Sequence, residues 1–241
     1  MKWNKPEDIY QRSISAHLGY GNFKKLQEST VLIAGMGGGS NIAELLVRKG
    51  VGNIIIADFD VYEIHNVRQR GASSSTVGKE KVTVMRSRLL DINPSANIQI
   101  YPEGVTTDNV IEMVSRADYI VDMLDFSAFL PKVIMSREAR EAGKFIITAP
   151  SVVNGALLFI FKPDGPSLEE LFGLDLNLDI EDQGEKLMHN LIKRFPLEAP
   201  RNMYMEASRG ERSIPLDAVG VDQAAVMAVA ALENLILDRT E

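Results

Sequence analysis

Short apolar runs alternate with amphipathic segments along most of the chain. The apolar runs are rich in β-branched residues, which is typical of strands buried within a sheet. The predicted strands are 30–35, 53–60, 97–105, 117–125, 144–150 and 156–163. Because segments with helical spacing separate most of them, the pattern predicts βαβ units and an α/β fold with a mostly parallel sheet flanked by helices.

The amphipathic segments predict the helices that cover this sheet. After the first strand, Ser40 is a candidate N-cap and Gly50 a C-terminal stop. The last helix is almost continuously apolar and rich in alanine, so we expect it to be buried against the sheet or at a subunit interface. The predicted helices are 40–49, 79–92, 129–142 and 222–237.

Composition and charge narrow the classes of function. The 241 residues carry a formal net charge of −7 and contain no basic tract, so nucleic-acid binding is not expected. No secretory signal and no apolar stretch of about 20 residues is recognised, which favours a cytoplasmic protein without membrane contact. There is no cysteine, so disulfides, Cys-ligated zinc and thiol nucleophiles are excluded.

A glycine-rich loop follows the first predicted strand. The segment TVLIAGMGGGS places Gly35, Gly37 and Gly38 where backbone amides and a helix N-terminus can hold phosphate. About 20 residues later, Asp58 and Asp60 end the second strand, where a carboxylate can accept hydrogen bonds from ribose hydroxyls. These features indicate a nucleotide but do not separate NAD from ATP, and the glycines could instead serve only tight packing.

Several motifs downstream carry a more specific resemblance. The segments SNIAELLVRKGVGNIIIADFDVYEIHNVRQR, TVGKEKV, INP and YIVDMLD follow one another in the order found in one superfamily. From about Tyr10 to Pro163 the chain resembles the ThiF/MoeB/HesA adenylyltransferases of the ubiquitin-activating enzyme superfamily. The resemblance implies a Rossmann-like fold and use of ATP and Mg²⁺. The substrate would be the C-terminal carboxylate of a ubiquitin-like or sulfur-carrier protein, or of a short peptide.

The resemblance also assigns roles to individual residues. Gly35, Gly37 and Gly38 would lie beside the phosphates, and Asp58 and Asp60 would face the ribose. The remaining family positions comprise the nucleotide contacts Asn66, Arg68 and Gln69, the triphosphate lysine Lys81, the magnesium ligand Asp125, and Arg12, which the family inserts into the partner subunit's site.

The chain departs from the family pattern at several positions. The glycine loop is one residue shorter, and only Val67 separates Asn66 from Arg68, which makes Arg70 a rival for the arginine role. The family's polar DxTDN becomes DMLDF. The family's CxxC zinc site is missing, so no zinc is expected, and without a cysteine the chemistry should end at the acyl-adenylate.

We therefore expect an adenylyltransferase that forms a homodimer. Its single domain would comprise an N-terminal helical segment (1–28), a Rossmann-like core (29–163), a variable partner-facing segment (164–214) and a closing helix (215–241). Two alternatives remain open. The glycine loop and Asp58 also suit an NAD-dependent oxidoreductase, and the departures from the family pattern also suit a non-catalytic scaffold of the same fold.

Overall fold

A six-stranded sheet forms the centre of the computed structural model, which describes residues 9–13, 17–125, 128–152, 154–175, 183, 186, 189–190, 201–208, 211 and 215–239. The strand order is β3-β2-β1-β4-β5-β8, and all pairs are parallel except β5 with β8. The strands are β1 (Thr30–Ala34), β2 (Asn53–Ala57), β3 (Asn97–Tyr101), β4 (Tyr119–Asp122), β5 (Phe145–Thr148) and β8 (Phe159–Phe161).

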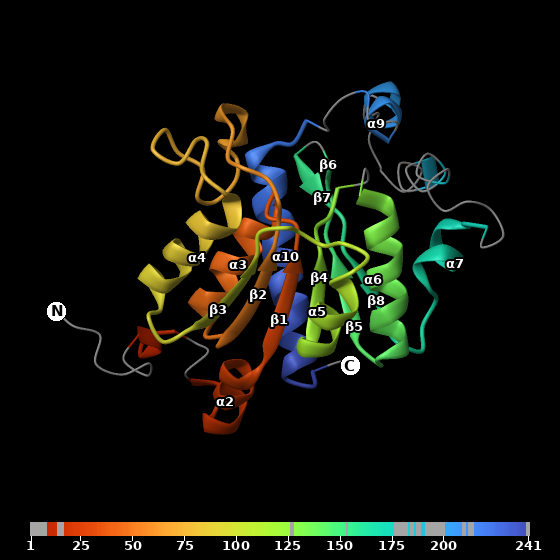
Figure 1. Cartoon of the computed structure of the whole chain (residues 1–241). Helices are drawn as coiled ribbons and strands as arrows, with labels where there is room; N and C mark the ends of the chain where they lie inside the picture. The colour runs from red at the N-terminus through yellow and green to blue at the C-terminus, as the bar shows by residue number, and fades with distance from the viewer. Residues whose placement is uncertain are drawn as a thin grey trace.

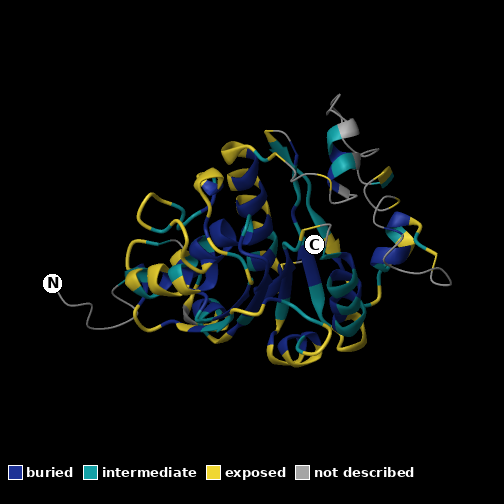
Figure 2. Cartoon of the chain, turned by 45° about the horizontal axis from the view of Figure 1, so that its top comes forward, coloured by how far each residue is buried: buried dark blue, intermediate teal, exposed yellow. Residues whose placement is uncertain are grey.

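Helices cover both faces of the sheet (Figure 1). One face packs against α3 (Gly39–Lys49), α4 (Lys81–Ile92) and α10 (Ala218–Ile236), and the other against α5 (Val110–Arg116) and α6 (Phe129–Glu141). Successive strand residues point to opposite faces, so Ile33 lies in the first core and Leu32 in the second. Figure 2 shows the buried residues in the strands and on the inner faces of the helices.

Smaller elements lie around this framework. They are α2 (Tyr20–Glu28), the 3₁₀ helix η2 (Ile64–Asn66), the paired strands β6 (Ser151–Val152) and β7 (Gly155–Ala156), α7 (Leu168–Phe172) and α9 (Arg201–Ser208). Most of the segment 176–214, within the part predicted to face a partner, lies outside the described residues. The division of the chain into four parts stays a prediction.

The predicted α/β architecture is confirmed, but several strands are shorter than expected. The apolar run 53–60 contains β2 only as far as Ala57, and the run 117–125 contains β4 only as far as Asp122. The acidic residues at their ends therefore lie in turns that follow the strands. The strand predicted at 156–163 is present but shorter, as β8 (Phe159–Phe161), and Ala156 belongs instead to β7 of the two-stranded sheet.

The long C-terminal helix α10 packs across the sheet and α3, as its apolar composition predicted. Its buried positions recur at helical spacing, including Val221, Ala225 and Leu232. By length and composition alone, α10 is apolar enough to cross a membrane, contrary to the expectation that no such stretch exists. Half of its most apolar window is buried inside the fold, as in a core helix.

Gly35 brings β1 into close contact with the turn after β4. Its φ is +93°, and a Cβ added there would lie 2.5 Å from the carbonyl oxygen of Met123. Any side chain would meet both a strained backbone conformation and a backbone clash. The strand-to-helix turn therefore depends on glycine at this position.

We predict that Gly35→Ala lowers the free energy of unfolding by more than about 3 kcal/mol, since the clash adds to the left-handed strain. Gly78→Ala is the matched control, because Gly78 also has a positive φ (+82°) but has open space around its Cα. The control should cost only about 1–2 kcal/mol. Urea unfolding of both variants measures the difference, and equal losses would contradict the proposed clash.

Candidate functional site

Three segments meet at the carboxyl ends of the central strands. They are the glycine loop (35–38), the crossover segment (58–80) between β2 and α4, and the β4 turn (123–125). The strand order changes direction between β1 and β4, which is the position at which open α/β sheets generally bind ligands. The candidate site therefore lies where the topology favours a ligand.

The glycine loop leaves the start of α3 without a side-chain cap. The expectation that Ser40 is the N-cap is wrong, because the helix begins at Gly39 and its N-cap is Gly38. The Ser40 hydroxyl instead donates to the carbonyl oxygen of Gly37, at 2.9 Å. Uncapped amides at a helix N-terminus attract anions, and phosphate is their common ligand. The predicted stop at Gly50 is confirmed by its left-handed φ of 102°.

Asp58 holds the glycine loop in place. Its carboxylate accepts hydrogen bonds from the backbone N–H of Met36 and, at 2.8 Å, from that of Asp60. Burial raises the pKa of Asp58, while Lys81 and these two N–H donors oppose the rise. The carboxylate is thus fixed beside the glycines, at the strand end where it was expected to face a ribose.

Asp60 and Lys81 form an ion pair across the base of the crossover segment. Lys81 Nζ lies 2.7 Å from Asp60 Oδ2, and the lysine side chain is only 6% exposed. The backbone N–H of Lys81 also donates to the Asp60 carbonyl, at 3.0 Å. Asp60 thereby positions the lysine that was expected to reach a triphosphate. An ammonium has three hydrogens, so one ion pair leaves donors for a phosphate.

Two polar atoms of the crossover segment are buried without a partner among the described residues. They are Nε of Arg68 and Oε1 of Gln69. The Gln69 side chain lies over the glycine loop, since a Cβ on Gly37 would be 3.8 Å from its Nε2. Buried polar groups normally have hydrogen-bond partners, so this unsatisfied pair fits a polar ligand bound beside the loop.

Asn66 and Arg68, two of the predicted nucleotide contacts, form hydrogen bonds within the crossover segment. Asn66, expected to contact the nucleotide, is buried and accepts the backbone N–H of Glu63 at 2.9 Å, which closes the turn η2. Arg68 donates to the carbonyl oxygen of His65 at 2.9 Å. Burial lowers the pKa of Arg68, and the charge of Asp125 opposes this. The structure thus places Arg68 within the electrostatic reach of Asp125.

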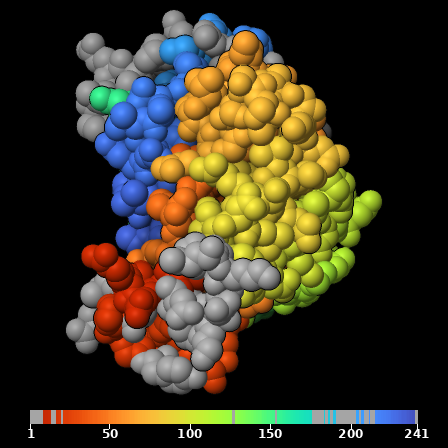
Figure 3. Space-filling model, turned by 90° about the vertical axis from the view of Figure 1, so that its left-hand side faces the viewer, coloured from red at the N-terminus to blue at the C-terminus, as the bar shows by residue number. Residues whose placement is uncertain are grey.

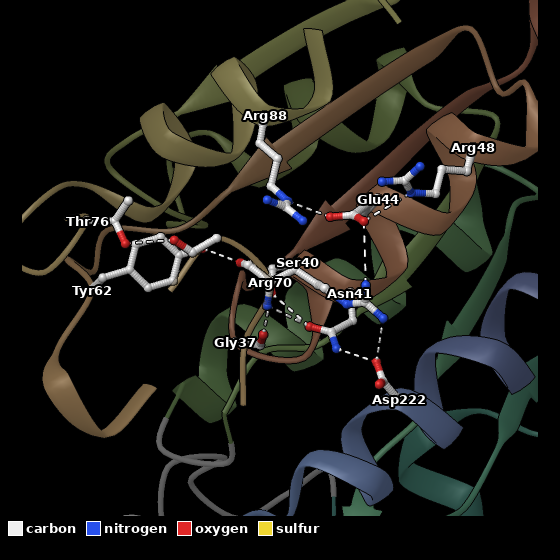
Figure 4. A network of polar contacts seen from close by, with 11 residues as sticks. Gly37, Ser40, Asn41, Glu44, Arg48, Tyr62, Arg70, Thr76, Arg88 and Asp222 are labelled. Atoms are coloured by element: carbon white, nitrogen blue, oxygen red, sulfur yellow. Dashed lines mark hydrogen bonds and ion pairs between the residues drawn. The ribbon is translucent and has the colours of Figure 1, made fainter. Parts of the chain in front are cut away.

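Arg70, the rival for the arginine role, is engaged elsewhere. Its guanidinium lies 3.5 Å from Glu44 and 3.0 Å from Asp222, and its backbone N–H donates to Asn41 (Figure 4). Glu44 is only 2% exposed and also pairs with Arg48 and Arg88. These contacts assign Arg70 to a polar network rather than to the glycine loop. The residues of this network form no recognised sequence motif, so the sequence analysis did not predict the network.

Arg12 lies far from the site in its own chain. Tyr10, two residues before Arg12, donates to the carbonyl of Val47, near the C-terminal end of α3. The glycine loop lies at the other end of this helix, about 12 Å from Val47 at 1.5 Å per residue. Arg12 is exposed. Arg12 is therefore not brought together with the other predicted site residues.

One carboxylate at the end of β4 is buried, and another in the β4 turn is exposed. Asp125 is exposed, whereas Asp122 pairs with the buried Lys132 at 2.6 Å and accepts the backbone N–H of Leu124. Among the described residues, no group of three or more His, Asp or Glu side chains could hold a metal ion. A single carboxylate suits Mg²⁺ that is bound mainly through phosphates and water.

These features define an α/β protein whose site suits an anionic nucleotide. Comparison with known proteins identifies the family: residues 10–232 match the model of the ThiF family, and the chain belongs to it. The expected resemblance is therefore confirmed.

Relatives with known names match parts of the chain. The sulfur carrier protein adenylyltransferase of Thermus thermophilus is 33% identical over 129 residues, which cover 52% of this chain and 48% of that protein. The tRNA threonylcarbamoyladenosine dehydratase of Bacillus subtilis is 34% identical over 57% of this chain and 54% of its own length. The chain thus spans about half the length of these relatives.

Solved structures show the same fold. The crystal structure of PaaA matches all of this chain and 77% of its own, with a TM-score of 0.73 and 18% identity. The structure of E. coli MccB with ATP covers 97% of this chain and 65% of its own, with a TM-score of 0.66 and 19% identity. At these identities, the matches establish the fold alone.

The buried carboxylate of Glu44 predicts a pH-dependent contribution to stability. Burial would raise the pKa of Glu44, but hydrogen bonds from Arg88 and Arg48 outweigh it and hold the pKa below its usual value. Because its pKa is lower in the folded state, the Glu44 carboxylate stabilises the fold at pH values above its pKa in the unfolded chain, which is about 4.3. This stabilisation is lost as the pH falls through the pKa of the folded state.

We therefore expect Glu44→Gln to cost about 2 kcal/mol at pH 7, and the cost to shrink below about pH 4. Glu112→Gln is the control, since its exposed i,i+4 pair with Arg116 should contribute under about 0.5 kcal/mol. Urea unfolding across pH measures both. A cost for Glu44→Gln that does not change with pH would refute the role of its charge.

Proposed function

We propose that this chain is an adenylyltransferase that activates a C-terminal carboxylate with ATP. The observation that carries the proposal is the unsatisfied pair Arg68 and Gln69 beside the uncapped glycine loop. Membership of the ThiF family and relatives named as adenylyltransferases support it. The substrate we propose is a ubiquitin-like or sulfur-carrier protein, or a short peptide. The sulfur carrier protein in the name of one relative, and the solved structure of E. coli MccB with MccA, support this proposal.

The reaction joins a carboxylate oxygen to the α-phosphorus of ATP and breaks the bond from that phosphorus to the bridging oxygen, releasing pyrophosphate. Two anions must approach each other, so cationic groups and N–H donors have to offset their charge. In the proposal, the glycine-loop amides hold the phosphates and Asp58 accepts a ribose hydroxyl. Arg68 and Lys81 stabilise the charge that develops on the phosphates.

Asp125 would hold Mg²⁺ in this reaction, and the metal would supply charge neutralisation between phosphate oxygens. The exposed position of Asp125 leaves its carboxylate accessible, and its charge acts on Arg68. With no cysteine in the chain, the proposed chemistry ends at the acyl-adenylate, and a separate nucleophile accepts the acyl group. We propose no zinc site in this protein.

We also propose that the protein forms a homodimer, because Arg12 lies at the far end of α3 from the site in its own chain. A second copy could supply this arginine in trans. The apolar helix α10 keeps Val219 and Val226 exposed, which gives weak support for association. We place the protein in the cytoplasm, where the ATP that it would consume is available.

Titration with ATP/Mg²⁺ and with NADH separates the proposal from an oxidoreductase. We expect ATP to bind and NADH not to bind. In the proposal Arg68 and Lys81 stabilise charge on a triphosphate, and a hydride-transfer site does not need this pair of cations. Calorimetry measures both ligands on the same protein sample. Tight NADH binding without ATP binding would overturn the proposal, and binding of neither would favour a scaffold.

Asp125→Ala should reduce Mg²⁺-dependent ATP–pyrophosphate exchange by about 100-fold or more, since an essential charge contact is removed. Exchange is measured with candidate carrier proteins and with peptides that have a free C-terminus. Asp91→Ala is the control, because Asp91 is also an exposed aspartate and lies near the C-terminal end of α4, which is not part of the candidate site. Full exchange activity in Asp125→Ala would refute the metal role of this residue.

A further inference from the structure

Apolar burial holds the middle of the crossover segment only weakly. Ile64 is 81% exposed and Val67 is 82% exposed, although both flank the residues of the candidate site. Tyr62 is the large buried side chain of this segment, and its hydroxyl donates to the carbonyl of Arg70 at 2.7 Å. Segments that bury little apolar surface open readily, so polar contacts must hold the residues between 64 and 70 in place.

Polar contacts at Arg70 supply this restraint. Its backbone N–H donates to Asn41 Oδ1 at 3.0 Å, and its guanidinium reaches both Glu44 of α3 and Asp222 of α10. Asn41 Nδ2 donates to the same oxygen of Asp222, at 2.7 Å. We call these four residues, Asn41, Glu44, Arg70 and Asp222, the latch (Figure 4).

The latch connects the glycine loop to the C-terminal helix. The single hydrogen of the Ser40 hydroxyl has two acceptors within reach, the Gly37 carbonyl at 2.9 Å and Asn41 Oδ1 at 3.1 Å. Asn41 Oδ1 also accepts the N–H of Arg70. The crossover segment and α10 lie side by side at the surface, as Figure 3 shows for the orange and blue regions. Residues far apart in the chain thus converge on one asparagine at the first turn of α3.

We propose that Arg70 is a positioning residue, which acts through the latch to keep Arg68 and Gln69 directed at the glycine loop. The inference rests on the proposed function, since it makes nucleotide affinity depend on Asp222, a residue of α10 that is not part of the candidate site. Arg70 itself makes no contact with the ligand in this scheme. Arg70 fits this role because its guanidinium pairs with the carboxylates of Glu44 and Asp222, while its backbone N–H donates to Asn41.

The test compares Arg70→Gln and Asp222→Asn with a matched control. The control is Asp238→Asn, which removes the same charge from an exposed ion pair with Lys25 just beyond α10. Asp222 is 52% exposed, so its isosteric replacement should leave the fold intact. Urea unfolding of each variant checks this.

Amide hydrogen exchange without nucleotide is the first readout. The N–H groups of Gln69, Arg70 and Ala72 each have an acceptor, so they report on this stretch directly. We expect their exchange to accelerate about tenfold in both latch variants, which corresponds to about 1.4 kcal/mol. Exchange in Asp238→Asn should match the unaltered protein. Unchanged exchange in both latch variants would overturn the proposal.

The dissociation constant for ATP/Mg²⁺ is the second readout. We expect it to rise about tenfold in Arg70→Gln and in Asp222→Asn. The loss in the double variant should be smaller than the product of the two single losses, because both substitutions remove the Arg70–Asp222 pair. Arg70→Lys should recover part of the loss, since an ammonium can still pair with one carboxylate. Faster exchange with unchanged ATP affinity would show a merely structural latch and would overturn the positioning role.

The two readouts also separate this inference from the proposed function. If the unaltered protein binds no ATP, the proposed function fails, and with it the role of Arg70 in nucleotide affinity. The exchange measurement still decides whether the latch holds the crossover segment. If ATP binds and the latch variants bind it as tightly as Asp238→Asn does, the inference alone fails.

Discussion

The contact between Gly35 and the backbone of Met123 is the constraint on which the site depends. It brings the end of β1 so close to the β4 turn that a Cβ has no room. The same approach sets where the glycine loop leaves the sheet and where α3 begins. Asp58 then fixes the loop through the N–H of Met36. This contact therefore holds the glycine loop beside the β4 turn.

Two kinds of force hold the parts of the site. Apolar burial of the strands and of the inner faces of α3, α4 and α10 positions the sheet and the glycine loop. The crossover segment, by contrast, depends on charged and polar contacts, namely the pairs Lys81–Asp60 and Arg70–Asp222. Such contacts are directional but sensitive to salt and solvent, so this side of the site should respond to its surroundings more than the sheet does.

The sequence predicted the fold where the hydrophobic pattern was strong. The buried runs gave β1, β2 and β4, and Gly50 marked the end of α3. The short helix α5 was missed, because seven residues contain too few turns for a clear periodic signal. Strand ends were set too late, since an acidic turn residue such as Asp60 looks like a strand residue until its hydrogen bonds are known.

Only the residues of the candidate site that lie in a sequence motif could be predicted. Glycines and strand-end acids are local signals, so Gly35 and Asp58 were found from spacing. The choice between Arg68 and Arg70 depends on Asp222, which lies 152 residues beyond Arg70, and no spacing rule links them. Asn66 was assigned to the nucleotide by resemblance, whereas its observed bond closes a turn. Whether it also contacts a ligand stays a prediction.

The distance along the chain between Arg70 and Asp222 has a consequence for biosynthesis. At about 5–20 residues per second, the ribosome needs roughly 8–30 s to add the 152 residues that separate them. During this time β1 to β8 can begin to assemble, but Arg70 lacks its carboxylate on α10. The crossover segment of a nascent chain therefore lacks the Arg70–Asp222 contact until that helix emerges from the ribosome.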